Sequence, residues 1–264
     1  MTQNDKAGKD YWNETWSKGE FPKLFDPKNQ SLDNYVNLEL HNYFKKILGN
    51  KKGFSVLEIG CANSIWPVYF HQEFNAEVYG LDYSEVGCRR SRALLEYYKV
   101  PGKIYCSDLF APSEDLIGKF DLVVSFGVVE HFENTAQCLK SCAAFVKPGG
   151  KLLTLIPNMS GIVGLIQKYV DRLVYDVHVP LTKKQFIMEH QKADLSLENC
   201  DYFMSINLNA ANSGSFAGHA FNTYLRHLLS GTSKIFWMLE KQGLTFPKNG
   251  VTSPYLIAVA KQCI

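Results

Sequence analysis

Charge of one sign, long apolar runs and paired cysteine motifs are all scarce in this sequence. Lysine and arginine total 28 against 26 aspartates and glutamates, and they are scattered, so we expect no nucleic-acid partner. The longest nearly apolar stretch, residues 122–129, is too short to span a membrane, so we expect no membrane partner. The seven cysteines form no Cys-x-x-Cys motif and the first ten residues are polar, which favours a reducing, cytoplasmic location.

The composition is that of a folded protein of ordinary enzyme size. The chain has 264 residues, of which 46% are hydrophobic, 13% aromatic and 20% charged. This is enough apolar material to bury a substantial core, which excludes intrinsic disorder. We find no internal repeat and no low-complexity linker.

From residue 54 onward, short apolar segments alternate with longer segments of helical character. The short segments are rich in β-branched and aromatic residues, and the central ones are apolar at nearly every position, as in strands buried on both faces. This alternation predicts a parallel α/β sheet. The expected strands are residues 54–60, 76–82, 103–108, 120–127, 150–157, 197–208 and 253–260. Helices are expected at residues 32–48, 161–173, 181–193 and 216–241.

Several of these strands end in residues suited to a nucleoside ligand. The first ends in Glu58-Ile59-Gly60, where a small residue lets a ligand approach the backbone. The second ends at Asp82, where a carboxylate can accept hydrogen bonds from both ribose hydroxyls. The third ends in Ser107-Asp108. Because the carboxyl ends of parallel strands meet in one crevice, these groups predict a common binding site.

Five segments in this order resemble the Rossmann-like S-adenosylmethionine-dependent methyltransferases, in particular their small-molecule branch. The segments are VLEIGCANS, VYGLDYS, YCSDLF, FDLVVSFGVVEHFEN and VKPGGKLLTLIPN, and SPYLIAVAKQ resembles the closing strand of that family. The resemblance implies a seven-stranded, mostly parallel sheet with helices on both faces, an N-terminal helical segment and helical lid insertions. It implies S-adenosylmethionine as the cofactor. One departure is that Ala62 and Ser64 stand where the family commonly has glycine.

The resemblance also assigns roles to individual residues. Glu58 would reach toward the amino group of the cofactor, Gly60 to Ala62 would line its methionyl chain, and Asp82 would hold the ribose. Tyr83 would lie against the adenine, and Asp108 with Leu109 would read the adenine edge. The full predicted cofactor set is Trp16, Glu58, Gly60, Cys61, Ala62, Asp82, Tyr83, Ser107, Asp108, Leu109, Ser125 and Phe126.

The segment after the fourth expected strand indicates the class of acceptor. It has no Asp/Asn-Pro-Pro-Tyr motif, which makes the amino groups of bases and glutamine amides unlikely acceptors, and no Pro-Cys nucleophile for pyrimidine carbon is present. Methyl transfer needs an aligned nucleophile and, for a hydroxyl or thiol, a base. We expect an O, N or S atom of a small metabolite as the acceptor. His131 and His178 are the two candidates for the base.

We expect acceptor specificity to come from segments added to the cofactor-binding core. Residues 1–50 are predicted to be an N-terminal helical lid, and residues 51–264 the methyltransferase domain, with lid insertions at about 157–180 and 209–250. A monomer or a homodimer is expected. The predicted acceptor-binding residues are Tyr11, Asn158, Tyr175, Asn207, His219 and Tyr224.

Two alternatives differ from this interpretation. A nicotinamide-dependent oxidoreductase is disfavoured because the loop lacks the later glycines of Gly-x-Gly-x-x-Gly, and the chain has no Tyr-x-x-x-Lys pair. A catalytically inert protein that binds S-adenosylmethionine, to sense it or to serve a partner, stays open. Ala62 and Ser64 in the loop and the absence of an obvious base motivate it.

Overall fold

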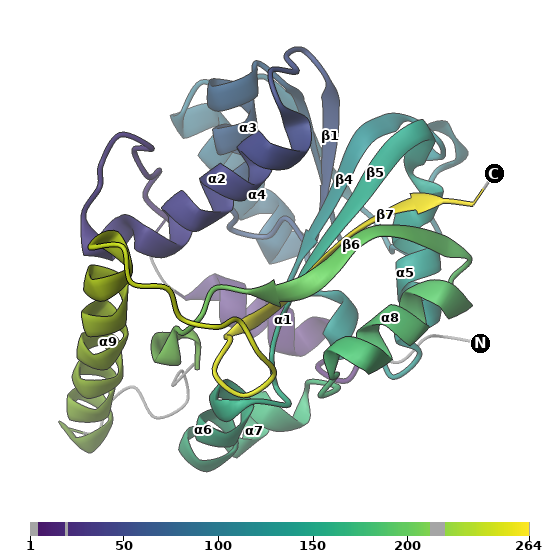
Figure 1. Cartoon of the computed structure of the whole chain (residues 1–264). Coiled ribbons are helices and arrows are strands. Elements are labelled where there is room, and N and C mark those ends of the chain that lie inside the picture. Colours follow the sequence, from purple (N-terminus) through teal and green to yellow (C-terminus); the bar gives the residue numbers. More distant parts are fainter. Residues whose placement is uncertain (1–4, 19–20, 212–219, 264) are drawn as a thin grey trace.

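The computed structural model describes residues 5–18, 21–211 and 220–263, and its centre is a single seven-stranded sheet (Figure 1). The strand order is β3-β2-β1-β4-β5-β7-β6, and β7 is antiparallel to both of its neighbours. The seven-stranded, mostly parallel sheet predicted from the sequence is therefore confirmed. The strands are β1 (Ser55–Ile59), β2 (Glu77–Asp82), β3 (Gly102–Cys106), β4 (Phe120–Phe126), β5 (Val146–Pro157), β6 (Leu195–Phe203) and β7 (Tyr255–Gln262).

Helices cover both faces of this sheet. Successive side chains of a strand point to opposite faces, so Leu57 lies in one apolar cluster and its neighbour Val56 in the other. Helices α5 and α8 pack on the first face, and α2 and α3 on the second (Figure 1). The helices are α1 (Lys9–Ser17), α2 (Tyr35–Leu48), α3 (Trp66–Phe74), α4 (Glu85–Tyr97), α5 (Thr135–Ala144), α6 (Ile162–Val170), α7 (Arg172–Asp176), α8 (Lys183–Lys192) and α9 (Ala220–Lys241).

Two of the differences between expected and observed elements have a clear physical cause. The helix expected at 161–173 is divided into α6 and α7, because Asp171 leaves the helical conformation and its carboxylate caps α7 by accepting from Val174 N–H. The strand expected at 197–208 ends at Phe203, since Met204 adopts a positive φ of 63° that an extended strand does not allow. Residues 216–219 of the last expected helix lie outside the described residues.

The two helices near the N-terminus have different positions. Helix α1 has no buried residue, whereas α2 buries Leu38, Leu40, Phe44 and Leu48. Phe44 is completely buried, and its ring lies 5.0 Å from Phe70 and 5.4 Å from Trp66, centroid to centroid. Although residues 1–50 were predicted together as a lid, α2 is thus part of the core. In the described part of the chain, no helix is long and apolar enough to cross a membrane.

The packing of α2 gives a stability prediction. Phe44→Ala should lower the free energy of unfolding by about 3–5 kcal/mol, because a large buried ring is lost and leaves a cavity. Tyr169→Ala is the control, since 83% of that side chain is exposed and its loss should change stability by less than about 0.5 kcal/mol. Urea denaturation of both variants checks this. Equal stability of the two would show that α2 is not part of the core.

Candidate active site

A cavity of about 330 Å³ opens at the carboxyl ends of β1, β2 and β4. The strand order reverses between β1 and β4, which is where open α/β sheets bind their ligands. The lining comes from the turns that follow these strands, from the turn after β3 and from α1. The sequence-predicted residues that line it are Trp16, Glu58, Gly60, Ala62, Asp82, Tyr83, Asp108, Leu109, Phe126 and His131.

The loop after β1 requires glycine at its first position. Gly60 has a φ of 73°, and a Cβ placed there would lie 2.4 Å from Cγ2 of Val128. The next positive φ of this loop belongs to Asn63, at 52°. Within the described backbone, neither Ala62 nor Ser64 has a positive φ, so neither position requires glycine. Their difference from the family pattern therefore does not prevent this loop from forming.

Glu58 places a buried carboxyl group at the floor of the cavity. Its side chain is 3% exposed, and Ser64 Oγ donates a hydrogen bond of 2.8 Å to Oε1. Burial raises the pKa of Glu58 to about 8, although the Ser64 bond acts in the other direction. Among the described residues, Oε2 has no hydrogen-bond partner. A buried acceptor of this kind fits a ligand that carries an amino group.

Asp82 is held in one orientation by the backbone around it. Its Oδ1 accepts from Ser84 N–H at 2.7 Å, and its Oδ2 accepts from Ala62 N–H at 3.1 Å. Burial raises the pKa of this carboxyl, whereas the backbone hydrogen bonds favour its charged form. Ser84 also caps α4 by accepting from Gly87 N–H, so the turn after β2 is fixed from both sides.

The remaining predicted cofactor residues occupy different positions around the same edge. Asp108 is exposed at the cavity, where its carboxylate accepts from Phe110 N–H at 2.9 Å, and Leu109 is buried in the lining. Ser107 lies directly before them and is not in the lining. Cys61 and Ser125 lie beneath the surface of the cavity and are almost completely buried. Their predicted roles are not tested by this geometry.

A segment at the N-terminus, residues 5–17, closes one side of the cavity. The Asp5 carboxylate accepts from Trp12 Nε1–H at 2.8 Å and from the Tyr83 hydroxyl. Trp12 stacks on Trp16 with centroids 5.9 Å apart, and both rings line the cavity. Asp5 was not predicted as a site residue. The signal for this segment was its aromatic residues, and nothing in the sequence indicated the bond to Tyr83.

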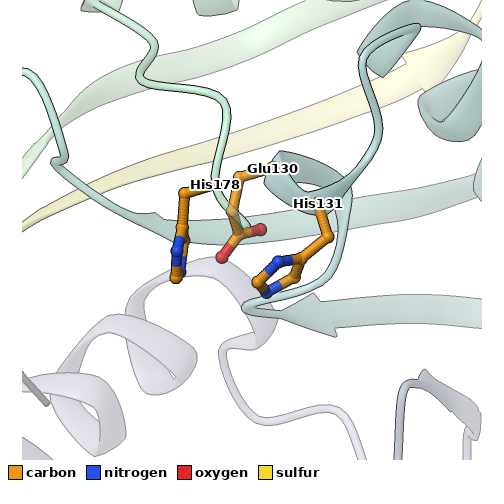
Figure 2. Close-up of side chains that lie close together, drawn as sticks. All are labelled: Glu130, His131 and His178. Carbon is orange, nitrogen blue, oxygen red and sulfur yellow. The ribbon is translucent and has the colours of Figure 1, made fainter. Parts of the chain in front are cut away.

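A second group of titratable side chains lies beside the cavity: Glu130, His131 and His178, here called the Glu-His-His cluster. Glu130 and His131 lie in the turn after β4, and His178 follows α7. The backbone joins the two segments, because Val179 N–H donates to the Glu130 carbonyl at 2.7 Å. The two imidazole rings are 4.5 Å apart, centroid to centroid, and the Glu130 carboxylate lies next to them (Figure 2). His131 itself lines the cavity.

Burial controls the protonation of this cluster. It lowers the pKa of His178 to about 4, with the nearby His131 imidazole contributing, and it also lowers the pKa of His131. Both imidazoles are therefore neutral at pH 7. Burial raises the pKa of Glu130 to about 8. The sequence singled out the two histidines, but Glu130 was missed, although its position next to His131 was a usable signal.

None of the predicted acceptor-binding residues that the structure describes lines the cavity. Asn158 has a structural position instead, because its Nδ2 donates to the carbonyls of Gly250 and Ser253 and ties the chain before β7 to the end of β5. Asn207 is buried and donates to the Tyr255 hydroxyl. Tyr224 is 69% exposed on α9. Their predicted role in binding the acceptor stays a prediction.

The other three predicted acceptor-binding residues are Tyr11, Tyr175 and His219. Tyr11 is half-buried on α1. Burial raises the pKa of its hydroxyl, and the negative charge of Asp171 raises this pKa further. Tyr175 lies on α7 with Lys168 Nζ 5.7 Å from its ring centroid. Neither contributes to the lining. His219 lies outside the described residues.

Comparison with known proteins identifies the family. A family described as a methyltransferase domain matches residues 31–200, so the chain belongs to that family and is an S-adenosylmethionine-dependent methyltransferase. Over 194 residues it is 28% identical to the demethylmenaquinone methyltransferase of Bacillus mycoides, covering 69% of this chain and 78% of the relative. It is 30% identical over 101 residues to the ubiquinone biosynthesis O-methyltransferase of Coxiella burnetii, covering 38% and 42%.

Solved structures support the fold. The geranyl diphosphate C-methyltransferase of Streptomyces coelicolor superposes with a TM-score of 0.60 at 11% identity, covering 97% of this chain and 98% of that one. Phosphoethanolamine N-methyltransferase 2 of Haemonchus contortus superposes with a TM-score of 0.59 at 18% identity, covering 96% and 57%. These likenesses show a shared fold. The unpartnered Glu58 oxygen and the close approach at Gly60 fit the amino acid part of S-adenosylmethionine.

The Gly60 turn can be tested with two glycine substitutions. Gly60→Ala and Gly118→Ala both force alanine into a positive φ, which should cost each variant about 1–2 kcal/mol of stability. Only the Cβ at position 60 meets a neighbour, because nothing lies within 4 Å of the Cβ at position 118. Calorimetry should show S-adenosylhomocysteine binding weakened at least about tenfold in Gly60→Ala alone. Equal affinities would place the cofactor elsewhere.

Asp82 gives a second binding prediction. Asp82→Asn keeps the size of the side chain and removes its charge, so S-adenosylhomocysteine should bind more weakly by about 1–3 kcal/mol. Asp33→Asn is the control, because 81% of the Asp33 side chain is exposed on another part of the surface. Titration calorimetry of both variants measures the difference. Unchanged affinity in Asp82→Asn would show that this carboxylate does not hold the ribose.

Proposed function

We propose that this methyltransferase transfers a methyl group to an O, N or S atom of a small metabolite. The observation that carries the proposal is that one cavity is lined both by the predicted cofactor-binding turns and by His131. The named relatives are a demethylmenaquinone methyltransferase and a ubiquinone biosynthesis O-methyltransferase, which supports a ring-containing acceptor of the quinone type. An acceptor atom beside His131 would face the cofactor side of the same cavity.

The chain's own residues supply positioning, exclusion of water and removal of a proton. S-adenosylmethionine, when bound, supplies an activated methyl group on a sulfonium, so the nucleophile mainly has to be aligned with it. Glu58, Asp82 and the Gly60 turn would hold the cofactor, and Trp12 and Trp16 would exclude water. We assign deprotonation of the acceptor to the Glu-His-His cluster, because it is buried and reaches the lining through His131.

The segments outside the sheet have proposed roles around the cavity. Residues 5–17 act as the lid over the cofactor, and the helices α6 and α7 place His178 beside His131. The insertion that contains α9 stays a prediction as an acceptor lid. The seven free cysteines support the proposed reducing, cytoplasmic location. A monomer or homodimer without nucleic-acid or membrane partners also stays a prediction.

The catalytically inert binding protein is the second candidate function. The observation that favours it is that Asn158, Asn207 and Tyr224 do not line the cavity, since these residues were expected to bind an acceptor. A protein that only senses the cofactor would need no acceptor site. The two functions differ in whether a methylated product forms.

A labelling experiment separates them. The protein is incubated with methyl-labelled S-adenosylmethionine and a panel of hydroquinones, catechols, thiols and amines, followed by a metabolite extract. Mass spectrometry should detect labelled product, and Asp82→Asn should lose product at low cofactor concentration, which excludes a contaminating enzyme. Cofactor binding without any labelled product would contradict the proposal and favour the inert pocket.

A further inference from the structure

The Glu-His-His cluster is a deeply buried group of titratable side chains beside the cavity. Glu130 is 1% exposed, His131 5% and His178 9%. Each offers one ligand atom, and these three atoms all lie within 4.8 Å of one another. The three side chains extend into the same space from two segments that are far apart in the sequence (Figure 2).

The hydrogen bonds around the cluster indicate which nitrogen of each imidazole carries the proton. Nδ1 of His131 lies 2.8 Å from the Val177 carbonyl oxygen, and Nδ1 of His178 lies 2.6 Å from the Val174 carbonyl oxygen. A carbonyl oxygen only accepts, so both Nδ1 atoms carry the proton and both Nε2 atoms carry a lone pair. Histidines that bind metal ions are held in this way, with the other ring nitrogen donating to a backbone carbonyl.

Hydrogen bonds within the protein do not explain the burial of the Glu130 carboxyl group. Both of its carboxyl oxygens are buried and, as far as the described residues go, neither has a hydrogen-bond partner. A protonated Glu130 that donated to an imidazole would satisfy one of them, but no such bond is present between the three side chains. The three side chains therefore form no hydrogen bond with one another, although they are close enough to share an ion.

We propose that Glu130, His131 and His178 bind a divalent first-row transition metal ion, with zinc as the type case. Two imidazole nitrogens and one carboxylate oxygen form the donor set of catalytic zinc sites, which keep further positions open for water or substrate. Mg²⁺ prefers oxygen ligands alone, so it is disfavoured here. Ligand atoms of a tetrahedral zinc lie about 3.3 Å apart, so the side chains close on the ion by small rotations.

The surroundings are compatible with a cation. The Asp5 carboxylate favours positive charge at His131, and the Lys6 ammonium opposes it. Lys6 Nζ donates to the His178 carbonyl at 3.2 Å, so this ammonium is already held by the backbone. The Gly127 carbonyl also lies near the His131 ring, and a Cβ at Gly127 would lie 3.5 Å from Glu130 Oε1.

The site also defines a class of acceptor, an inference that rests on the proposed function. His131 belongs both to the cluster and to the cavity lining, so an open position on the ion can face the acceptor. An acidic hydroxyl of a phenol or catechol that binds there loses its proton to water more readily. Its oxygen then forms the new bond to the methyl carbon, and the electron pair of the broken sulfur–carbon bond stays on sulfur.

Cobalt titration tests the ion site without turnover. Chelator-treated protein should bind one Co²⁺ with the absorption spectrum of a four- or five-coordinate nitrogen and oxygen site, which differs from that of the thiolates at exposed Cys106 and Cys263. Zn²⁺ should compete with it, and Mg²⁺ should bind at least about tenfold more weakly. Absence of this spectrum, or equal competition by Mg²⁺, would overturn the proposal.

Variants identify the ligands. Glu130→Gln and His178→Gln should each weaken Co²⁺ binding at least about tenfold, as loss of one of three ligands requires. His71→Gln is the matched control, because His71 lines a separate depression beside Asn75 and Gly102. S-adenosylhomocysteine binding and the melting temperature show whether each variant is folded. Equal Co²⁺ affinity in folded Glu130→Gln, or the same loss in His71→Gln, would contradict the assignment.

Binding of a coloured catechol tests the proposed class of acceptor. The chromogenic catechol 4-nitrocatechol should change its absorption on binding to the cobalt-loaded protein, and the change should be absent in chelator-treated protein and in Glu130→Gln. No change with the loaded protein would overturn the acceptor assignment. Methyl transfer is scored separately, so a failure of the proposed function is distinguishable from a failure of the ion site.

Discussion

The close approach of two turns at the carboxyl edge of the sheet is the constraint on which the rest of the site depends. Gly60 follows β1 and Val128 follows β4, and only a residue without a side chain lets the two turns meet. The first turn bounds the cofactor side of the cavity. The second continues directly into Glu130 and His131, so the same contact places the acceptor side next to the cofactor side.

Burial of polar groups without full hydrogen bonding marks where ligands belong. Such groups cost free energy in a folded protein and persist where function needs them. Glu58 and Glu130 are both buried, both have a pKa raised to about 8 by burial, and both have carboxyl oxygens with no partner among the residues described. Glu58 lines the cavity, and Glu130 lies beside it next to His131. These positions agree with a cofactor amine at Glu58 and a cation at Glu130.

Segments that are far apart in the chain complete the site. Asp5 joins α1 to the turn after β2 through Trp12 and Tyr83, so the N-terminal segment covers the cavity by specific hydrogen bonds. His178 reaches His131 because the chain after β5 folds back through α6 and α7. Both additions lie outside the sheet, which explains how a common fold can serve different acceptors.

The sequence by itself determined the alternation of strands and helices, the sheet type and the polar strand ends Glu58, Asp82 and Asp108. These follow from local hydrophobic periodicity and from the rule that parallel strands end on one edge. Only the tertiary structure decided that Glu130 lies next to two imidazoles, that Asp5 holds Trp12, and that Asn158 ties two backbone segments together. Such contacts depend on how distant loops pack, and no local pattern records that packing.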